Sequence, residues 1–129
     1  MTATALQRWH GIVASCEMDG LHDLLAEDAV FHSPVVHTPQ VGKALTQRYL
    51  AAAFGVFGNE TFHYVREVVG NGDAVLEFQV EIDGITVNGV DMIKWDSDGR
   101  IVDFKVMIRP LKAINLIHQK MMAMLQPMH

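Results

Sequence analysis

The stretch 74-AVLEFQVEI-82 decides the fold of this chain. Apolar and polar residues alternate along it, so that every second side chain, from Leu76 to Ile82, lies on one apolar face. A period of two predicts a β-strand with one buried face. Asp83-Gly84 follows directly and is typical of a tight hairpin turn. The stretch therefore predicts an antiparallel hairpin with one face toward a core.

The same period extends over most of the second half of the chain. Further strands are expected at residues 61–69, 85–95 and 101–108, with turns at 70–73 and 96–99. Four consecutive strands joined by short turns predict an antiparallel meander.

The first half of the chain has helical periodicity instead. Leu6, Trp9, Val13 and Cys16 form one stripe of an opening helix, and Asp19-Gly20 predicts the start of a short second helix. The other expected elements are a strand at 29–33 ended by Pro34, a loop at 35–42, a helix at 43–54 and a last helix at 111–126. The order ααβαββββα predicts an α+β fold, with a curved antiparallel sheet that forms a cone closed by helices, an α+β barrel.

Length and composition fit one domain over residues 1–129. Hydrophobic residues are 50% of the chain, more than a plain core needs, so an internal pocket or a dimer face is expected. A homodimer through the outer sheet face is the expected assembly, with Glu77, Gln79, Glu81, Asp103 and Lys105 on that face.

Charge and apolar runs exclude several classes of partner. The net charge is −5, and no basic run is present, so nucleic acid is not an expected partner. No apolar run approaches the length of a membrane span, so no membrane partner is expected. The N-terminal residues do not resemble a signal peptide, which predicts a cytoplasmic location.

Two segments resemble a known family. The first is 7-QRW-9 with 19-DGL-21 and 24-LLAEDAVFHSP-34, and the second is 89-GVDMIKW-95 with 98-DGRIVD-103. Together they resemble the nuclear-transport-factor-2-like superfamily, in its SnoaL-like and ketosteroid-isomerase-like branch. The resemblance implies a cone of curved sheet, often dimeric through the outer sheet face. The superfamily includes isomerases, dehydratases, cyclases, epoxide hydrolases and binding modules without catalytic activity.

The resemblance also implies site positions. Ketosteroid-isomerase-like enzymes use a tyrosine on the first helix, an acid at the end of the first strand and an acid on the penultimate strand. In this chain Trp9, Ser33 and Asp91 stand at those positions. A serine cannot transfer a proton as a carboxylate does, so steroid isomerase activity of that kind is doubtful.

Asp91 is the best candidate for a catalytic residue. If it points inward, burial raises its pKa and keeps it protonated as a hydrogen-bond donor. If it points outward, it is an ordinary solvated aspartate. His37, in the loop near the expected mouth, is the candidate for a base, whereas Ser33 either orients a ligand or caps a turn.

Apolar side chains that face the inside of a cone line any cavity it contains. The candidate ligand-binding residues are Trp9, Phe31, Ser33, Tyr49, Phe54, Phe78, Phe104 and Val106. A ligand in such a place is apolar with a few polar groups. The seven histidines lack the spacing of metal ligands, and the chain has one cysteine, so neither a metal nor another cofactor is expected.

Three functions remain open. The first is an enzyme that isomerises, cyclises or dehydrates an apolar carbonyl compound by proton transfer. The second is a binding module with the same pocket and no reaction. The third is a dimeric interaction domain whose cone is filled by side chains.

Overall fold

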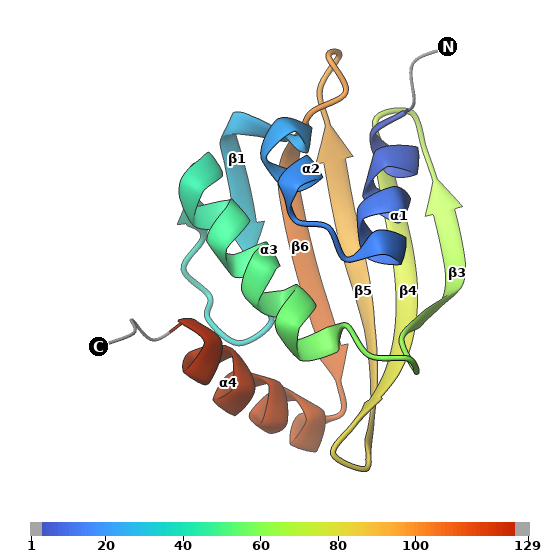
Figure 1. Ribbon diagram of the computed structural model, residues 1–129, viewed down its shortest axis with the longest axis vertical. Helices are drawn as coiled ribbons and strands as arrows, with labels where there is room; N and C mark the ends of the chain where they lie inside the picture. The colour runs from blue at the N-terminus through green and yellow to red at the C-terminus, as the bar shows by residue number, and fades with distance from the viewer. Residues whose placement is uncertain (1–3, 126–129) are drawn as a thin grey trace.

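The computed structural model describes residues 4–125, and within them the chain forms four helices and one six-stranded sheet (Figure 1). The sheet is curved, and the helices lie on one of its faces. The helices are α1 (Ala5–Ser15), α2 (Asp19–Leu24), α3 (Lys43–Phe57) and α4 (Leu111–Leu125). The strands are β1 (Leu25–His32), β2 (Gln40–Val41), β3 (His63–Val69), β4 (Asp73–Ile82), β5 (Ile85–Trp95) and β6 (Ile101–Arg109).

The predicted α+β fold class is confirmed, with two differences in the sheet. The strand order is β2-β1-β6-β5-β4-β3, so β2 and β3 are edges and the sheet does not close into a barrel. β3 to β6 form the predicted antiparallel meander, but β1 pairs with β6 in parallel. β1 and β6 are far apart in sequence, because four strands and α3 separate them.

The alternation in β4 determines which face of the sheet is buried. Ala74, Leu76, Phe78, Val80 and Ile82 are all buried, and the residues between them are half-buried or exposed. Their neighbours across β5 and β6 share this inner face, and the helices cover it. The core therefore lies between the sheet and the helices, where any internal cavity is bounded by both.

α1 is fixed at both ends by its own sequence. Thr4 caps it, since its hydroxyl accepts from Gln7 N and the Gln7 side chain accepts from Thr4 N. Cys16 ends it in the left-handed conformation, with φ of 57°. The helix buries Trp9 and Ile12, and Cys16 remains exposed.

Several boundaries differ from the predicted ones. β1 begins at Leu25 instead of residue 29, and the predicted loop contains the two-residue β2. α3 continues through Gly55 to Phe57 and ends at Gly58. Gly55 is a packing site, because a Cβ there would overlap Cε of Met124 on α4. The predicted end of the last helix, residue 126, lies outside the described residues.

The outer face of the sheet is open in the chain described here. It carries exposed apolar side chains on β3, β5 and β6, namely Val68, Met92 and Met107. Charged side chains of both signs lie on the same face, including Arg66 and Glu77, which form an ion pair at 2.8 Å. Within residues 4–125, none of the helices has the length and apolar character that crossing a membrane requires.

Candidate functional site

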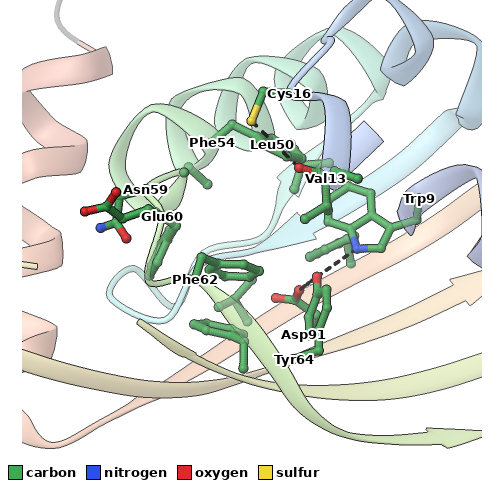
Figure 2. Close-up of a pocket in the computed structure, with 17 residues that line it drawn as sticks. Trp9, Val13, Cys16, Leu50, Phe54, Asn59, Glu60, Phe62, Tyr64 and Asp91 are labelled. Carbon is green, nitrogen blue, oxygen red and sulfur yellow. Dashed lines mark hydrogen bonds between the residues drawn. The ribbon is translucent and has the colours of Figure 1, made fainter. Parts of the chain in front are cut away.

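A cavity of about 410 Å³ lies between the inner face of the sheet and the helices. α1 and its C-cap, α3, the loop after α3 and the central strands each contribute to its wall (Figure 2). The helical lining residues are Trp9, Val13, Ala14, Cys16, Leu50, Ala53, Phe54 and Phe57. The loop and strand residues are Gly58, Asn59, Glu60, Phe62, Tyr64, Phe78, Asp91, Phe104 and Val106.

Asp91 is a buried carboxyl in this apolar wall. It lies on β5 between Leu76 of β4 and Val106 of β6, and only 6% of its surface is exposed. The sequence leaves its direction open, and the structure places it on the inner face of the sheet. A carboxyl flanked by two aliphatic side chains has lost most of its hydration.

Asp91 is connected to the helical layer by a chain of two hydrogen bonds. Trp9 Nε1 donates to the hydroxyl oxygen of Tyr64 at 3.0 Å, and the Tyr64 hydroxyl donates to Asp91 Oδ2 at 2.9 Å (Figure 2). An indole nitrogen can only donate, so the direction of the first bond is fixed. The hydroxyl of Tyr64 has one hydrogen, which lies on the Asp91 side.

The hydrogen-bond chain leaves the second oxygen of Asp91 available. Among residues 4–125, no side chain or backbone group forms a hydrogen bond with Oδ1 of Asp91. If Asp91 carries a proton, Oδ1 is therefore the oxygen that holds it, because Oδ2 is already an acceptor. This oxygen can donate to a ligand or take a proton from it.

Burial shifts the acidity of both groups in the same direction. Desolvation raises the pKa of Asp91 to about 7, and the hydrogen bond from Tyr64 opposes part of that rise. Burial also raises the pKa of the Tyr64 hydroxyl, and the nearby charge of Asp91 adds to the effect. Tyr64 is therefore a permanent donor at neutral pH, and Asp91 exists in both protonation states.

Aromatic rings form most of the remaining wall. Trp9 packs against Phe104 with ring centroids 4.8 Å apart and against Phe54 at 5.5 Å. Phe78 stacks on Phe62 at 5.3 Å and meets Phe57 edge-on at 5.5 Å. These ring contacts give the cavity a largely aromatic interior.

The structure brings six of the predicted site residues to the cavity. These are Trp9, Phe54, Phe78, Asp91, Phe104 and Val106. Phe31 and Tyr49 are outside its wall, where their rings stack on each other at 5.5 Å. Phe31 also lies behind Phe104, with centroids 6.2 Å apart, so it supports the wall without lining it.

Ser33 and His37 are not brought to the cavity. The Ser33 hydroxyl accepts hydrogen bonds from the backbone N–H groups of Val35 and Val36, at 3.1 and 3.3 Å, and so caps the turn after β1. Of the two roles that the sequence left open for Ser33, the structure therefore shows the turn cap. His37 is exposed in the loop that follows. β1 ends at His32, so both residues lie in the loop after this strand.

Tyr64 is the main residue that sequence reasoning missed. It lies on β3, in the predicted strand 61–69, but alternation there is interrupted by a bulge between Tyr64 and Arg66. A one-residue bulge reverses the faces of all residues beyond it, so the pattern could not assign Tyr64 to the inner face. Asn59 and Glu60, at the other end of the cavity, carried no periodic signal because they belong to a loop.

Fold and cavity together define a class of protein. A curved sheet covered by helices on one face is the fold of the NTF2-like proteins, and in this chain it carries a buried acid on a central strand. The SnoaL-like domain family matches residues 6–104, about three-quarters of the chain. The chain belongs to this family.

Solved structures support the same assignment. A steroid delta-isomerase from Pseudomonas aeruginosa is 38% identical over 92% of this chain and 87% of its own, with a TM-score of 0.87. An uncharacterised protein with a cystatin-like fold from Silicibacter pomeroyi is 32% identical over 92% and 83%, with a TM-score of 0.84. An NTF2-like protein of unknown function from Mesorhizobium loti shares the fold at 20% identity over 82% and 88%, with a TM-score of 0.70. The comparison with curated proteins gives no match.

Proposed function

We propose that this protein binds an apolar carbonyl compound in the cavity and exchanges a proton with it through Asp91. One observation carries the proposal: a buried carboxyl has its free oxygen in an aromatic cavity and a permanent donor behind it. The cavity volume of about 410 Å³ lies within the usual range for small-molecule sites, ~300–1,000 Å³.

The chemistry of Asp91 suits a proton that is taken up and then returned. A group with a pKa of about 7 is half ionised at neutral pH, so it is both a usable base and a usable acid. An isomerisation of a β,γ-unsaturated ketone needs both forms in turn. The same proton transfer can serve a cyclisation or a dehydration.

The isomerisation balances with the residues present. The Asp91 carboxylate takes a proton from the carbon between the carbonyl and the double bond, and the electron pair moves into the carbonyl oxygen as a dienolate. The proton is then held on Oδ1, from which the protonated Asp91 donates to the dienolate oxygen, while Tyr64 keeps its hydrogen bond to Oδ2. Asp91 returns the proton to the γ-carbon, the conjugated ketone forms, and the carboxylate is regenerated.

The similarity to the steroid delta-isomerase from Pseudomonas aeruginosa supports the choice of substrate class. The support is limited to this class, because Ser33 stands where enzymes of the ketosteroid-isomerase type have an acid. Asp91 is consequently assigned both proton steps. Glu60 is the other carboxylate of the wall, and it lies at the opposite end from Asp91 (Figure 2).

Binding and turnover test the proposal together. Calorimetry with 2-acetylnaphthalene, a neutral bicyclic ketone, is expected to show saturable binding. A bicyclic β,γ-unsaturated ketone is expected to convert to its conjugated isomer, seen by ultraviolet absorbance, and Asp91→Asn is expected to abolish this conversion. Asp98→Asn is the matched control, because Asp98 lies in the turn between β5 and β6, away from the cavity.

A binding module without a reaction is the second candidate. It is favoured by Ser33, which caps a turn outside the cavity and stands where related enzymes have an acid. Among the lining residues, Asp91 is therefore the one carboxyl at its end of the cavity. Binding of 2-acetylnaphthalene with no turnover of any unsaturated ketone supports this candidate. Absence of binding and of turnover contradicts both functions and favours an interaction domain.

We also propose that a second copy covers the outer sheet face. Exposed apolar side chains beside charges of both signs make this face suitable for pairing with the same face of a second copy about a two-fold axis. Light scattering after gel filtration is expected to give twice the chain mass. Met107→Glu is expected to give the mass of one chain, and an unchanged mass would contradict this interface.

A further inference from the structure

We infer that Glu60 selects ligands by the charge of the end that points out of the cavity. A cation or a hydrogen-bond donor is favoured there, and a carboxylate is disfavoured. This inference rests on the proposed function, because it concerns the outer end of a ligand whose carbonyl group meets Asp91. It adds a determinant of specificity that the proton transfer does not require.

The cavity has two polar ends separated by aromatic rings. Asp91 and Tyr64 lie at one end, and Asn59 and Glu60 lie at the other, with Phe62 between them (Figure 2). A flat apolar ligand that fills this space carries one polar group to each end. Its first group meets Asp91 and its second emerges beside Glu60.

The loop that carries Glu60 is firmly held. Asn59 Nδ2 donates to the backbone oxygen of Glu81 on β4 at 2.9 Å, and Asn59 Oδ1 accepts from Thr61 N at 2.8 Å. Thr61 Oγ1 accepts from Glu81 N at 2.9 Å, which joins the loop to β4 a second time. Because both neighbours of Glu60 are tied to the sheet, its backbone has a fixed position at the rim.

Glu60 is also the single charge at this end. The other lining residues there are neutral, and within residues 4–125 the carboxylate of Glu60 forms no ion pair. An unpaired carboxylate beside an apolar wall leaves a negative potential at the mouth. Its exposure limits the effect to a few-fold in affinity, with a clear dependence on salt.

The test uses three ligands with one scaffold. They are 2-acetylnaphthalenes with an aminomethyl, a hydroxymethyl or a carboxylate group at the far end of the ring system, and calorimetry gives Kd for each. The full chain is expected to bind the amine three- to tenfold more tightly than the carboxylate, on the order expected for one exposed charge. Glu60→Gln is expected to remove this preference, and Glu60→Lys is expected to reverse it.

A control variant and the neutral ligand show whether a negative result concerns Glu60 alone or the proposed function as well. Asp98→Asn removes the same charge from a remote turn and is expected to keep the preference of the natural chain. If the neutral hydroxymethyl ligand binds and Glu60→Lys leaves the order unchanged, the role of Glu60 is contradicted and the proposed function stands. If the neutral ligand does not bind, the proposed function and this inference are both contradicted.

Discussion

The hydroxyl of Tyr64 lies 2.9 Å from Oδ2 of Asp91 and joins the edge strand β3 to the central strand β5 across the inner face of β4. This bond occupies one oxygen of the carboxyl and leaves the other toward the cavity. Trp9 completes the arrangement from α1, because its indole occupies the hydroxyl oxygen of Tyr64 as a donor. This contact orients the Asp91 carboxyl and lowers its pKa, while burial raises that pKa by more.

The pH dependence of turnover tests the role of Asp91 as a base. Its carboxylate form takes the first proton, so kcat/KM is expected to rise with pH and to level off above a midpoint of about 7. A rate that falls as the pH rises through 7 would show instead that the protonated acid is the active form. Steady-state rates of the natural chain across this range decide between the two.

The stability of the chain is expected to depend on pH through the same group. The folded-state pKa of Asp91 is raised, so its contribution is fully present below the unfolded value of ~4 and is lost as the pH rises through about 7. The loss amounts to up to about 4 kcal/mol. Asp91→Asn is expected to lack it, so urea unfolding at pH 5 and pH 8 should differ less in the variant. An equal change in both proteins would contradict the raised pKa.

Tyr64→Phe is expected to change the acidity of Asp91 as well as stability. The variant leaves the Trp9 N–H without its partner, which costs about 1–2 kcal/mol. It also removes a hydrogen bond that lowers the pKa of Asp91, so the midpoint of the pH–rate profile should move upward. Tyr49→Phe is the control, because Tyr49 is outside the cavity wall. An unchanged midpoint in Tyr64→Phe would show that Tyr64 does not affect the pKa of Asp91.

Gly89→Ala is expected to disturb the cavity by displacing Phe78, a residue of its wall. A Cβ on Gly89 would lie 2.5 Å from Cζ of Phe78 and 2.7 Å from the backbone oxygen of Met107, so the Phe78 ring must move. Crowding of this kind costs about 1–3 kcal/mol, and 2-acetylnaphthalene should bind more weakly. Gly11→Ala adds a methyl where no atom lies within 4 Å, and it should stabilise α1 by about 0.5–1 kcal/mol. Thermal unfolding and calorimetry of both variants make the comparison.

Cys16 provides a chemical probe of the cavity mouth. It is the single cysteine of the chain, it is exposed, and it lines the cavity. Saturating 2-acetylnaphthalene is expected to slow its alkylation by iodoacetamide several-fold, because the ligand covers the thiol. Mass spectrometry follows the reaction. An unchanged rate at a ligand concentration that calorimetry shows to be saturating would place the ligand elsewhere.

Local patterns in the sequence predicted much of this fold. The alternation in residues 74–82 correctly gave the buried face of β4, since one side of that strand is covered throughout. The parallel pairing of β1 with β6 could not be read in this way. A short strand shows which residues are apolar and carries no local signal for the strand beside which it will lie.

The candidate site was predictable where it lies on regular strands and helices. Phe78 follows from the β pattern and Trp9 from a helical stripe, whereas Asp91 was singled out by the family resemblance and its direction was left open. Tyr64 did not follow from the pattern, because the bulge beside it changes the face that each residue occupies. Ser33 was placed by its position before Pro34, but its hydroxyl caps the turn there. Loops and bulges are thus the places where tertiary contacts, and not periodicity, decide the role of a residue.

A carbon-13 NMR titration of the aspartate carboxyls tests the central claim most directly, with the Asp91 signal assigned by its loss in Asp91→Asn. A midpoint of about 7 is expected for Asp91 in the free protein. A higher midpoint is expected with 2-acetylnaphthalene bound, because the ketone oxygen accepts a hydrogen bond from the protonated acid. A midpoint near the ordinary ~4 of an aspartate, or one that does not respond to the ketone, would contradict this claim.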